Sequence, residues 1–113
     1  MKYYEEELMG ALREMVEAEL LSWPDVSTKK MFGCPSYKVG DKLFAFLVTD
    51  GLVLIGLPDE LREKLLSERG GTHFTTGNRT MKTWVRMPLE TPDDLPALME
   101  LAGVGYDRLS EAE

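Results

Sequence analysis

Two closely spaced tight-turn signals constrain the fold of this chain more than any other feature. Gly40-Asp41 fits a two-residue hairpin loop with glycine at the first central position. Asp50-Gly51 fits the loop type in which both central residues have positive φ. Because apolar residues flank both signals, the segment 35–55 is predicted to form a meander of three antiparallel strands.

Two-residue loops would also fix the register of this meander. Val39 would then face Lys42, and Val48 would face Val53. Since side chains alternate between the faces of a strand, one face is expected to be a core face. It holds Pro35, Tyr37, Val39, Phe44, Phe46, Val48, Val53 and Ile55. The other face holds Cys34, Ser36, Lys38, Leu43, Ala45, Leu47, Leu52 and Leu54.

The second face is too apolar to be left in water, because a meander with one solvated face should be polar at alternate positions. The leucines on it are Leu43, Leu47, Leu52 and Leu54. Two explanations remain open: the chain's own helices cover this face, or it is a binding surface for a protein partner or a second subunit.

Composition indicates a single cytoplasmic domain spanning residues 1–113. No apolar run is long enough to cross a bilayer, the N-terminus lacks a signal-peptide pattern, and one cysteine cannot form an internal disulfide. The net charge of −7 weighs against non-specific DNA binding. Basic residues nevertheless concentrate in the segments 28–42 and 69–89, which keeps an anionic ligand possible.

The remaining segments predict helices on either side of further strands. Residues 4–21 fit an amphipathic helix, 27–32 a strand, 59–69 a helix, 83–87 a strand, and 72–75 either a loop or a short strand. The apolar stripe of the first helix is Tyr4, Leu8, Leu12, Met15, Val16 and Leu20. A last helix is expected to start at Asp93 or Asp94, with a break or kink at Gly103 and Gly105. The predicted fold class is α+β, an antiparallel sheet with helices packed on it.

Two motifs resemble the TfoX N-terminal domain family (TfoX/Sxy-like proteins). The first comprises K-M-F-G at Lys30–Gly33, P-x-Y at Pro35–Tyr37 and G-D-K-L-F-A at Gly40–Ala45. The second lies in Gly77–Pro88 and consists of Gly77, Arg79, Met81, Lys82, Trp84, Val85 and Pro88, with Asn78 inserted after the glycine. The resemblance implies a two-layer α/β sandwich similar to the YjbR-like and secretion-chaperone folds. The family is named for a regulator of bacterial competence, and no catalytic residue set or cofactor comes with it.

The chemistry-bearing residues are few. Cys34 would need a lowered thiol pKa and a nearby base to act as a nucleophile, and His73 is the only histidine. One histidine and one cysteine do not make a metal site, so neither a metal nor a cofactor is predicted. A cationic rim beside aromatic rings is possible if the two motifs are neighbours in the fold. Its members would be Lys30, Phe32, Tyr37, Arg79, Lys82 and Trp84, with Lys29 beside them.

Three functions compete on this basis. The leading hypothesis is a non-enzymatic regulatory module that binds a protein partner or self-associates. The alternative is a binder of an anionic ligand or single-stranded nucleic acid through the cationic and aromatic cluster. A thiol enzyme that uses Cys34 is the third.

Overall fold

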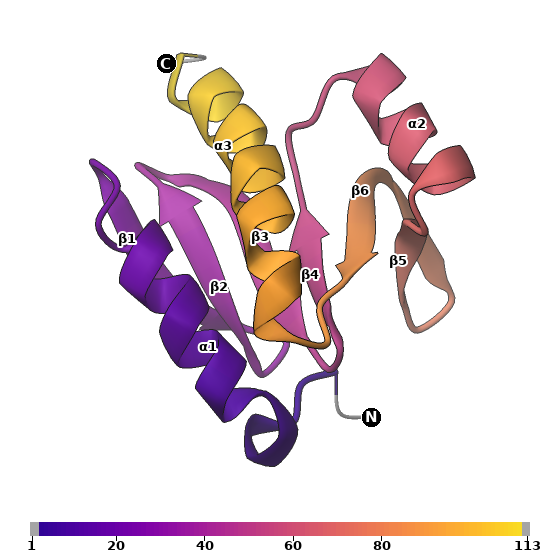
Figure 1. Cartoon of the computed structure of the whole chain (residues 1–113). Coiled ribbons are helices and arrows are strands. Elements are labelled where there is room, and N and C mark those ends of the chain that lie inside the picture. Colours follow the sequence, from indigo (N-terminus) through magenta and orange to yellow (C-terminus); the bar gives the residue numbers. More distant parts are fainter. Residues whose placement is uncertain (1–2, 112–113) are drawn as a thin grey trace.

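The computed structural model describes residues 3–111, which form a six-stranded antiparallel sheet and three α-helices (Figure 1). The strand order is β1-β2-β3-β4-β6-β5, so that β1 and β5 are the edges. The elements are α1 (Glu6–Leu20), β1 (Val26–Met31), β2 (Cys34–Val39), β3 (Lys42–Val48), β4 (Gly51–Leu54), α2 (Asp59–Glu68), β5 (Thr72–Thr76), β6 (Arg79–Pro88), a 3-10 turn η1 (Pro92–Asp94) and α3 (Leu95–Glu111). The predicted α+β class is confirmed.

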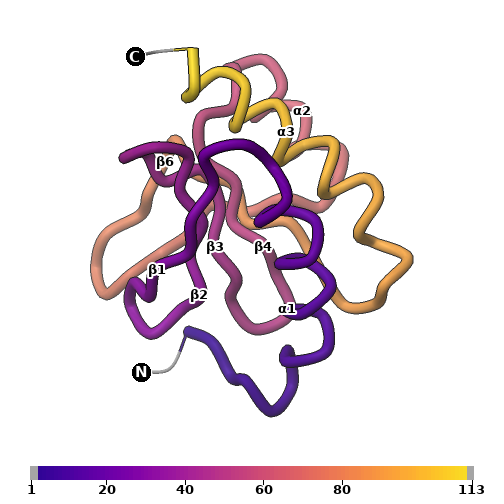
Figure 2. Tube along the Cα trace, turned by 90° about the vertical axis from the view of Figure 1, so that its left-hand side faces the viewer, coloured from indigo at the N-terminus to yellow at the C-terminus, as the bar shows by residue number. Residues whose placement is uncertain are grey.

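The helices cover one face of the sheet, where the larger core cluster lies. In Figure 2 the helices α1 and α3 lie together on one side of the central strands. From α1 the residues Met9, Leu12, Val16 and Leu20 are buried, and Leu95, Leu98 and Ala102 are buried from α3. Helix α2 packs on β5 and β6. The spacing of these buried residues matches the three-to-four-residue period that turns one stripe of a helix inward.

A second, mainly aromatic cluster fills the opposite face. Its buried members are Cys34, Phe46, Val48, Val53 and Phe74, with Tyr3, Trp84 and Met81 packed against them. Phe46 makes edge-on contacts with Phe74 and Trp84, at centroid distances of 5.1 and 5.5 Å. The residues of this cluster come from strands, from the segments beside them and from the start of the chain. Both faces of the meander are therefore apolar because both are packed.

A β-bulge in β3 changes the predicted register and with it the predicted faces. Val39 does pair with Lys42, but beyond the bulge Tyr37 pairs with Ala45 instead of Phe44. Phe44 and Ala45 consequently both belong to the helix-side cluster, and Phe46 belongs to the opposite one. An inserted residue reverses the alternation of faces from that point on. The division into a core face and a leucine face is wrong for this reason.

The second loop of the meander lies one residue earlier than predicted. Val48 pairs with Gly51, which leaves Thr49 and Asp50 as the loop residues. Asp50 adopts the left-handed conformation, with φ of 59°. Gly51 is instead a strand residue against the side chain of Arg86, where a Cβ would lie 2.9 Å from Nε. The glycine therefore lies beneath the Arg86 side chain in β4 and is not part of the turn.

The predicted leucine face is covered by the chain's own helices. Leu47, Leu52 and Leu54 are at most 1% exposed and belong to the same cluster as the buried residues of α1 and α3. Leu43 is half-buried and packs with the opposite cluster. Of the two explanations for this face, cover by helices therefore holds. The hypothesis that these leucines form a partner or dimer surface is wrong for the three that are buried.

Several element boundaries also differ from the prediction. Helix α3 continues through Gly103 and Gly105 without a break. Its start is prepared by a capping box between Thr91 and Asp94, one turn before the first α-helical residue. Strand β6 begins at Arg79, and 72–76 forms strand β5, which pairs with it. Within residues 3–111 no helix is long and apolar enough to span a membrane.

Candidate binding groove beside the edge strand

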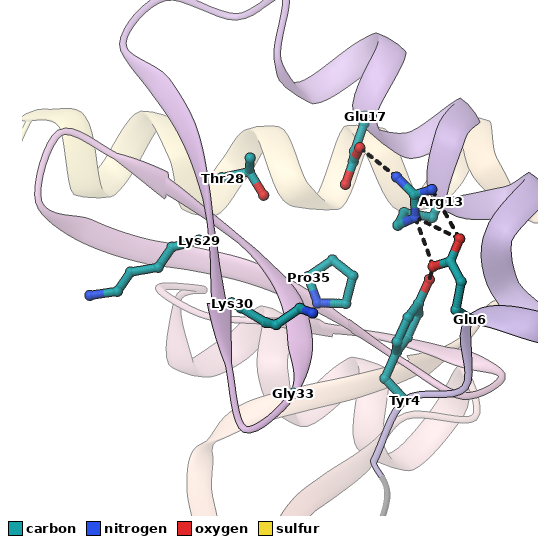
Figure 3. Close-up of a pocket in the computed structure, with 9 residues that line it drawn as sticks. All are labelled: Tyr4, Glu6, Arg13, Glu17, Thr28, Lys29, Lys30, Gly33 and Pro35. Carbon is teal, nitrogen blue, oxygen red and sulfur yellow. Dashed lines mark hydrogen bonds and ion pairs between the residues drawn. The ribbon is translucent and has the colours of Figure 1, made fainter.

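An open groove of about 690 Å³ separates α1 from the hairpin of β1 and β2. One wall carries Glu6, Arg13 and Glu17 of α1, and Tyr4 lies at one end. The other wall carries Thr28, Lys29, Lys30, Gly33 and Pro35 (Figure 3). The groove thus has polar side chains on both walls and lies directly beside the edge of the sheet.

Arg13 organises the helix wall. Its Nε is 2.9 Å from Oε1 of Glu6, and its Nη1 is 2.9 Å from Oε1 of Glu17. The hydroxyl of Tyr37, which reaches up from β2, donates to Oε2 of Glu17 at 2.9 Å. These residues are held in place by charged hydrogen bonds on a rigid helix, so the wall is pre-organised.

The pKa values along this wall follow from the same contacts. Hydrogen bonds from Arg13 and then from Tyr4 lower the pKa of Glu6. Burial, followed by the hydrogen bond to Glu6, raises the pKa of Tyr4 to about 12. Burial and the bond to Glu17 also raise the pKa of Tyr37. At neutral pH Glu6 is therefore ionised, whereas Tyr4 and Tyr37 keep their protons.

The strand wall supplies cations that no carboxylate holds. Among residues 3–111 the ion pairs are Arg13–Glu6, Arg13–Glu17 and Arg62–Asp59, and no lysine takes part. Both Lys29 and Lys30 are exposed, and they point to opposite sides of β1 (Figure 3). The edge strand thus presents positive charge on each of its two faces.

Lys29 also borders a smaller hollow of about 160 Å³ on the other side of the strand. It shares this hollow with Met31, Ser36, Lys38, Asp41 and Leu43. The edge of β1 therefore lies between two hollows, and each contains at least one lysine. A chain lying along this edge would place alternate side chains over one hollow and then the other.

The outer edge of β1 has unpaired backbone groups. Strand β1 pairs only with β2, and its middle residues are exposed. The amide of Gly40 donates to the carbonyl of Asp25, and in an antiparallel ladder the inward-bonded residues alternate. It follows that Ser27 and Lys29 bond to β2, whereas Thr28 and Lys30 direct their N–H and C=O groups outward. This edge has the geometry that accepts an additional strand.

The cluster predicted from the two motifs is only partly brought together. Lys30 lines the groove, but Tyr37 lies fully buried beneath α1 on the helix face. Phe32 is 48% exposed at the hairpin tip with φ of 55°, a conformation that costs energy in a residue other than glycine. Trp84 packs in the aromatic cluster on the opposite face, at 6.1 Å from Phe74.

Tyr3 connects Phe32 at the hairpin tip to the aromatic cluster on the face opposite the helices. Its ring lies 6.2 Å from Phe32 and 5.6 Å from Phe74. Arg79 and Lys82 are exposed on β6, in the hairpin at the other edge of the sheet from Lys30. The groove lined by Lys30 is lined by neither of these cations.

Cys34 is packed away from solvent. Its side chain is buried, its weak hydrogen bond goes to the carbonyl of Phe32 at 3.8 Å, and burial raises the pKa of the thiol to about 11. His73 is exposed on β5. A buried, protonated thiol without a base beside it is a poor nucleophile, which counts against the thiol-enzyme hypothesis.

The sequence interpretation missed the helix wall of the groove. Glu6, Arg13 and Glu17 lie on one side of α1, because positions separated by seven and four residues share a helix face. The signal was therefore present in the spacing, but nothing in the sequence showed that this side of the helix would face β1.

Comparisons of this chain with protein-family models, with curated proteins and with solved structures find no match.

Proposed function

We propose that this chain is a non-enzymatic interaction module of the TfoX N-terminal type, which binds an extended acidic segment of a partner protein along the free edge of β1. The main support is the edge itself, where outward backbone groups are flanked on both sides by unpaired lysines. Main-chain hydrogen bonds would provide affinity, and the two hollows would select the side chains. The resemblance adds support because the K-M-F-G part of its first motif, Lys30–Gly33, lies at the end of this strand.

An acidic occupant is favoured by the charges at the edge. Lys29, Lys30 and Lys38 border the two hollows. The acids of the larger groove, Glu6 and Glu17, are both paired with Arg13, and the single acid of the smaller hollow is Asp41. Two copies of β1 paired edge to edge would instead bring the lysines of both copies together, and like charges facing one another destabilise a sheet. Self-association through this edge is therefore the weaker possibility.

A nucleic acid or small anion is the competing occupant. Against it stands the net charge of −7. Arg13, the cation best placed for phosphate, is already held by the carboxylates of Glu6 and Glu17. A peptide satisfies the backbone edge as well as the lysines, whereas a phosphate satisfies only the lysines.

The test uses a peptide of about eight residues in which glutamate and valine pairs alternate, so that both faces carry acids. The control peptide has the same sequence with alternate amides N-methylated, which removes the donors a strand needs. Strand addition predicts binding of the first peptide and loss of about tenfold or more in affinity for the second. Equal binding of both peptides would rule out strand addition.

Matched protein variants locate the site. Thr28→Pro removes an outward N–H that the ladder does not use, and Thr28→Val keeps it. We expect the proline variant to lose the peptide, the valine variant to bind it, and both to keep the circular dichroism spectrum of the parent. Loss of binding in both variants would show that the backbone edge is not the determinant.

Charge variants separate the two classes of occupant. Lys29→Glu with Lys30→Glu should abolish peptide binding, whereas Lys64→Glu on α2 should not. A single-stranded oligothymidine is titrated in parallel from about 50 to about 200 mM salt. Salt-dependent oligonucleotide binding that survives Thr28→Pro, without peptide binding, would overturn the proposal in favour of a nucleic-acid binder.

A further inference from the structure

The exposed side of α1 carries apolar residues that the sheet does not cover. Leu8 and Met15 are 63% and 45% exposed, although both belong to the apolar stripe predicted to face the core. Residues seven positions apart lie almost above one another on a helix, so these two side chains form one line. Ala11 and Ala18 are exposed beside them. The apolar stripe of α1 is thus wider than the surface it buries.

At Met15 this line borders a second groove, between α1 and the start of α3. The groove has a volume of about 380 Å³ and is lined by Met15, Glu19, Pro92, Leu95, Pro96 and Met99. The two helices lie side by side over the sheet in Figures 1 and 2. The prolines stiffen the α3 wall, since a fixed φ removes backbone freedom. An apolar trough between two parallel ridges accepts a third helix.

Acidic residues flank the groove on both sides. On α1, Glu7 and Glu14 are exposed on the solvent side of the apolar line. On the other side, Glu100 and Asp107 are exposed seven residues apart on α3. Each set repeats with the period of a helix packed against another helix.

The cations of these two helices do not neutralise the flanks. Arg13 lies on the other side of α1, bonded to Glu6 and Glu17. Arg108 donates to the carbonyl of Gly56 at 2.8 Å, near the end of α3. An apolar trough between two uncompensated acidic lines is complementary to a helix with one apolar face and basic flanks.

We propose that the groove between α1 and α3 is a docking site for a basic amphipathic helix of a partner protein. It is independent of the β1 edge, which lies on the other side of α1. A second copy of this chain would bring its own acidic lines against the same lines and be repelled. An anionic lipid surface would be repelled for the same reason.

The probe is a helical peptide of about fourteen residues with leucine at heptad core positions and lysine elsewhere. A peptide with glutamate in place of lysine is the control. In the Thr28→Pro background, which lacks the acidic-segment site proposed at β1, we expect the lysine peptide to bind and the glutamate peptide not to bind. Met15→Asp should weaken the lysine peptide by about tenfold or more. Leu21→Asp, which changes an equally exposed leucine outside the groove lining, should leave the affinity unchanged.

Charge reversal tests the flanks. Glu14→Lys with Glu100→Lys should weaken the lysine peptide, whereas Glu63→Lys on α2 should have little effect. An equal loss in the Leu21→Asp or Glu63→Lys variants would reduce the binding to non-specific attraction and overturn the proposal. Sedimentation of the protein alone gives a second outcome: a dimer abolished by Met15→Asp would assign the groove to another copy of the chain instead.

Discussion

Gly105 of α3 packs directly against the carbonyl oxygen of Ile55, so closely that a Cβ at this position would fall inside contact distance of that oxygen. The glycine lets the helix approach the residue that follows β4, and α3 runs through it without a break. A sequence reading treats glycines in a helix as breaks because they weaken it. Here the glycine is retained for close packing.

Gly105→Ala should therefore destabilise the protein by about 2 kcal/mol, as overpacking of a core does. Gly103→Ala provides the matched control, because its Cβ would meet only Trp23, at 3.9 Å. That change should stabilise the helix by about 0.5 to 1 kcal/mol through intrinsic propensity. Urea unfolding of both variants measures the difference, and effects of the same sign would contradict this account.

The meander was predictable from local chemistry, whereas its faces were not. Gly40 has φ of 58° as the first loop requires, and its loop residues fix the nearby pairing. The bulge, however, depends on tertiary contacts. Phe44 stacks on Trp23 at 6.1 Å and meets Tyr106 edge-on at 5.7 Å, both on the helix side. No pattern within the strand reveals that the rings of two other elements hold Phe44 there.

The candidate site, like the meander, was predictable from the sequence only in part. Lys30 was identified from a local cluster of charge, and the structure places it in a groove. Tyr37 was assigned to the same cluster, yet it is buried, because it lies on the helix face of β2 beside Val39 with its hydroxyl on Glu17. Which side of α1 faces the sheet edge is decided by packing across the whole domain. The sequence period determines that a helix has an inner stripe, but not what lies at its two sides.

Leu47 tests whether the leucines belong to the core. Leu47→Ala should lower the free energy of unfolding by about 3 kcal/mol because it opens a cavity between sheet and helices. Leu8→Ala, at an exposed position, should change it by no more than about 0.5 kcal/mol. Chemical unfolding of the two variants makes the comparison. A small effect at Leu47 together with a loss of dimer would restore the idea of a leucine interface.

Alkaline pH should destabilise the fold through Cys34 and Tyr37. Burial raises the pKa of the Cys34 thiol from 9.0 to about 11 and also raises the pKa of the Tyr37 hydroxyl. The unfolded chain then loses these protons at lower pH than the folded chain does. Stability is accordingly complete below about pH 9 and falls as the pH rises towards 11.

Mutation separates the contributions of Cys34 and Tyr37 to this loss of stability. Cys34→Ala should remove the part of the decline that begins near pH 9, and Tyr37→Phe should remove the part that begins above the ordinary tyrosine pKa of 10.0. Unfolding free energies measured across this range give both curves. An unchanged decline in both variants would show that other groups cause it.

Asp94 should stabilise the start of α3 only while it is ionised. Its Oδ2 accepts from the amides of Glu90 and Thr91, at 2.9 and 3.1 Å, and these bonds lower the pKa of the carboxyl. A lowered pKa gives stability that is present above the unfolded value of 3.8 and is lost as the pH falls through the folded value. We therefore expect Asp94→Asn to unfold at lower urea concentration than the parent at neutral pH, with the gap closing well below pH 3.8. Asp93→Asn, at the exposed neighbouring carboxylate, should show a smaller gap at every pH. A gap for Asp94→Asn that persists in acid would mean that the substitution acts through lost packing and not through the charged cap.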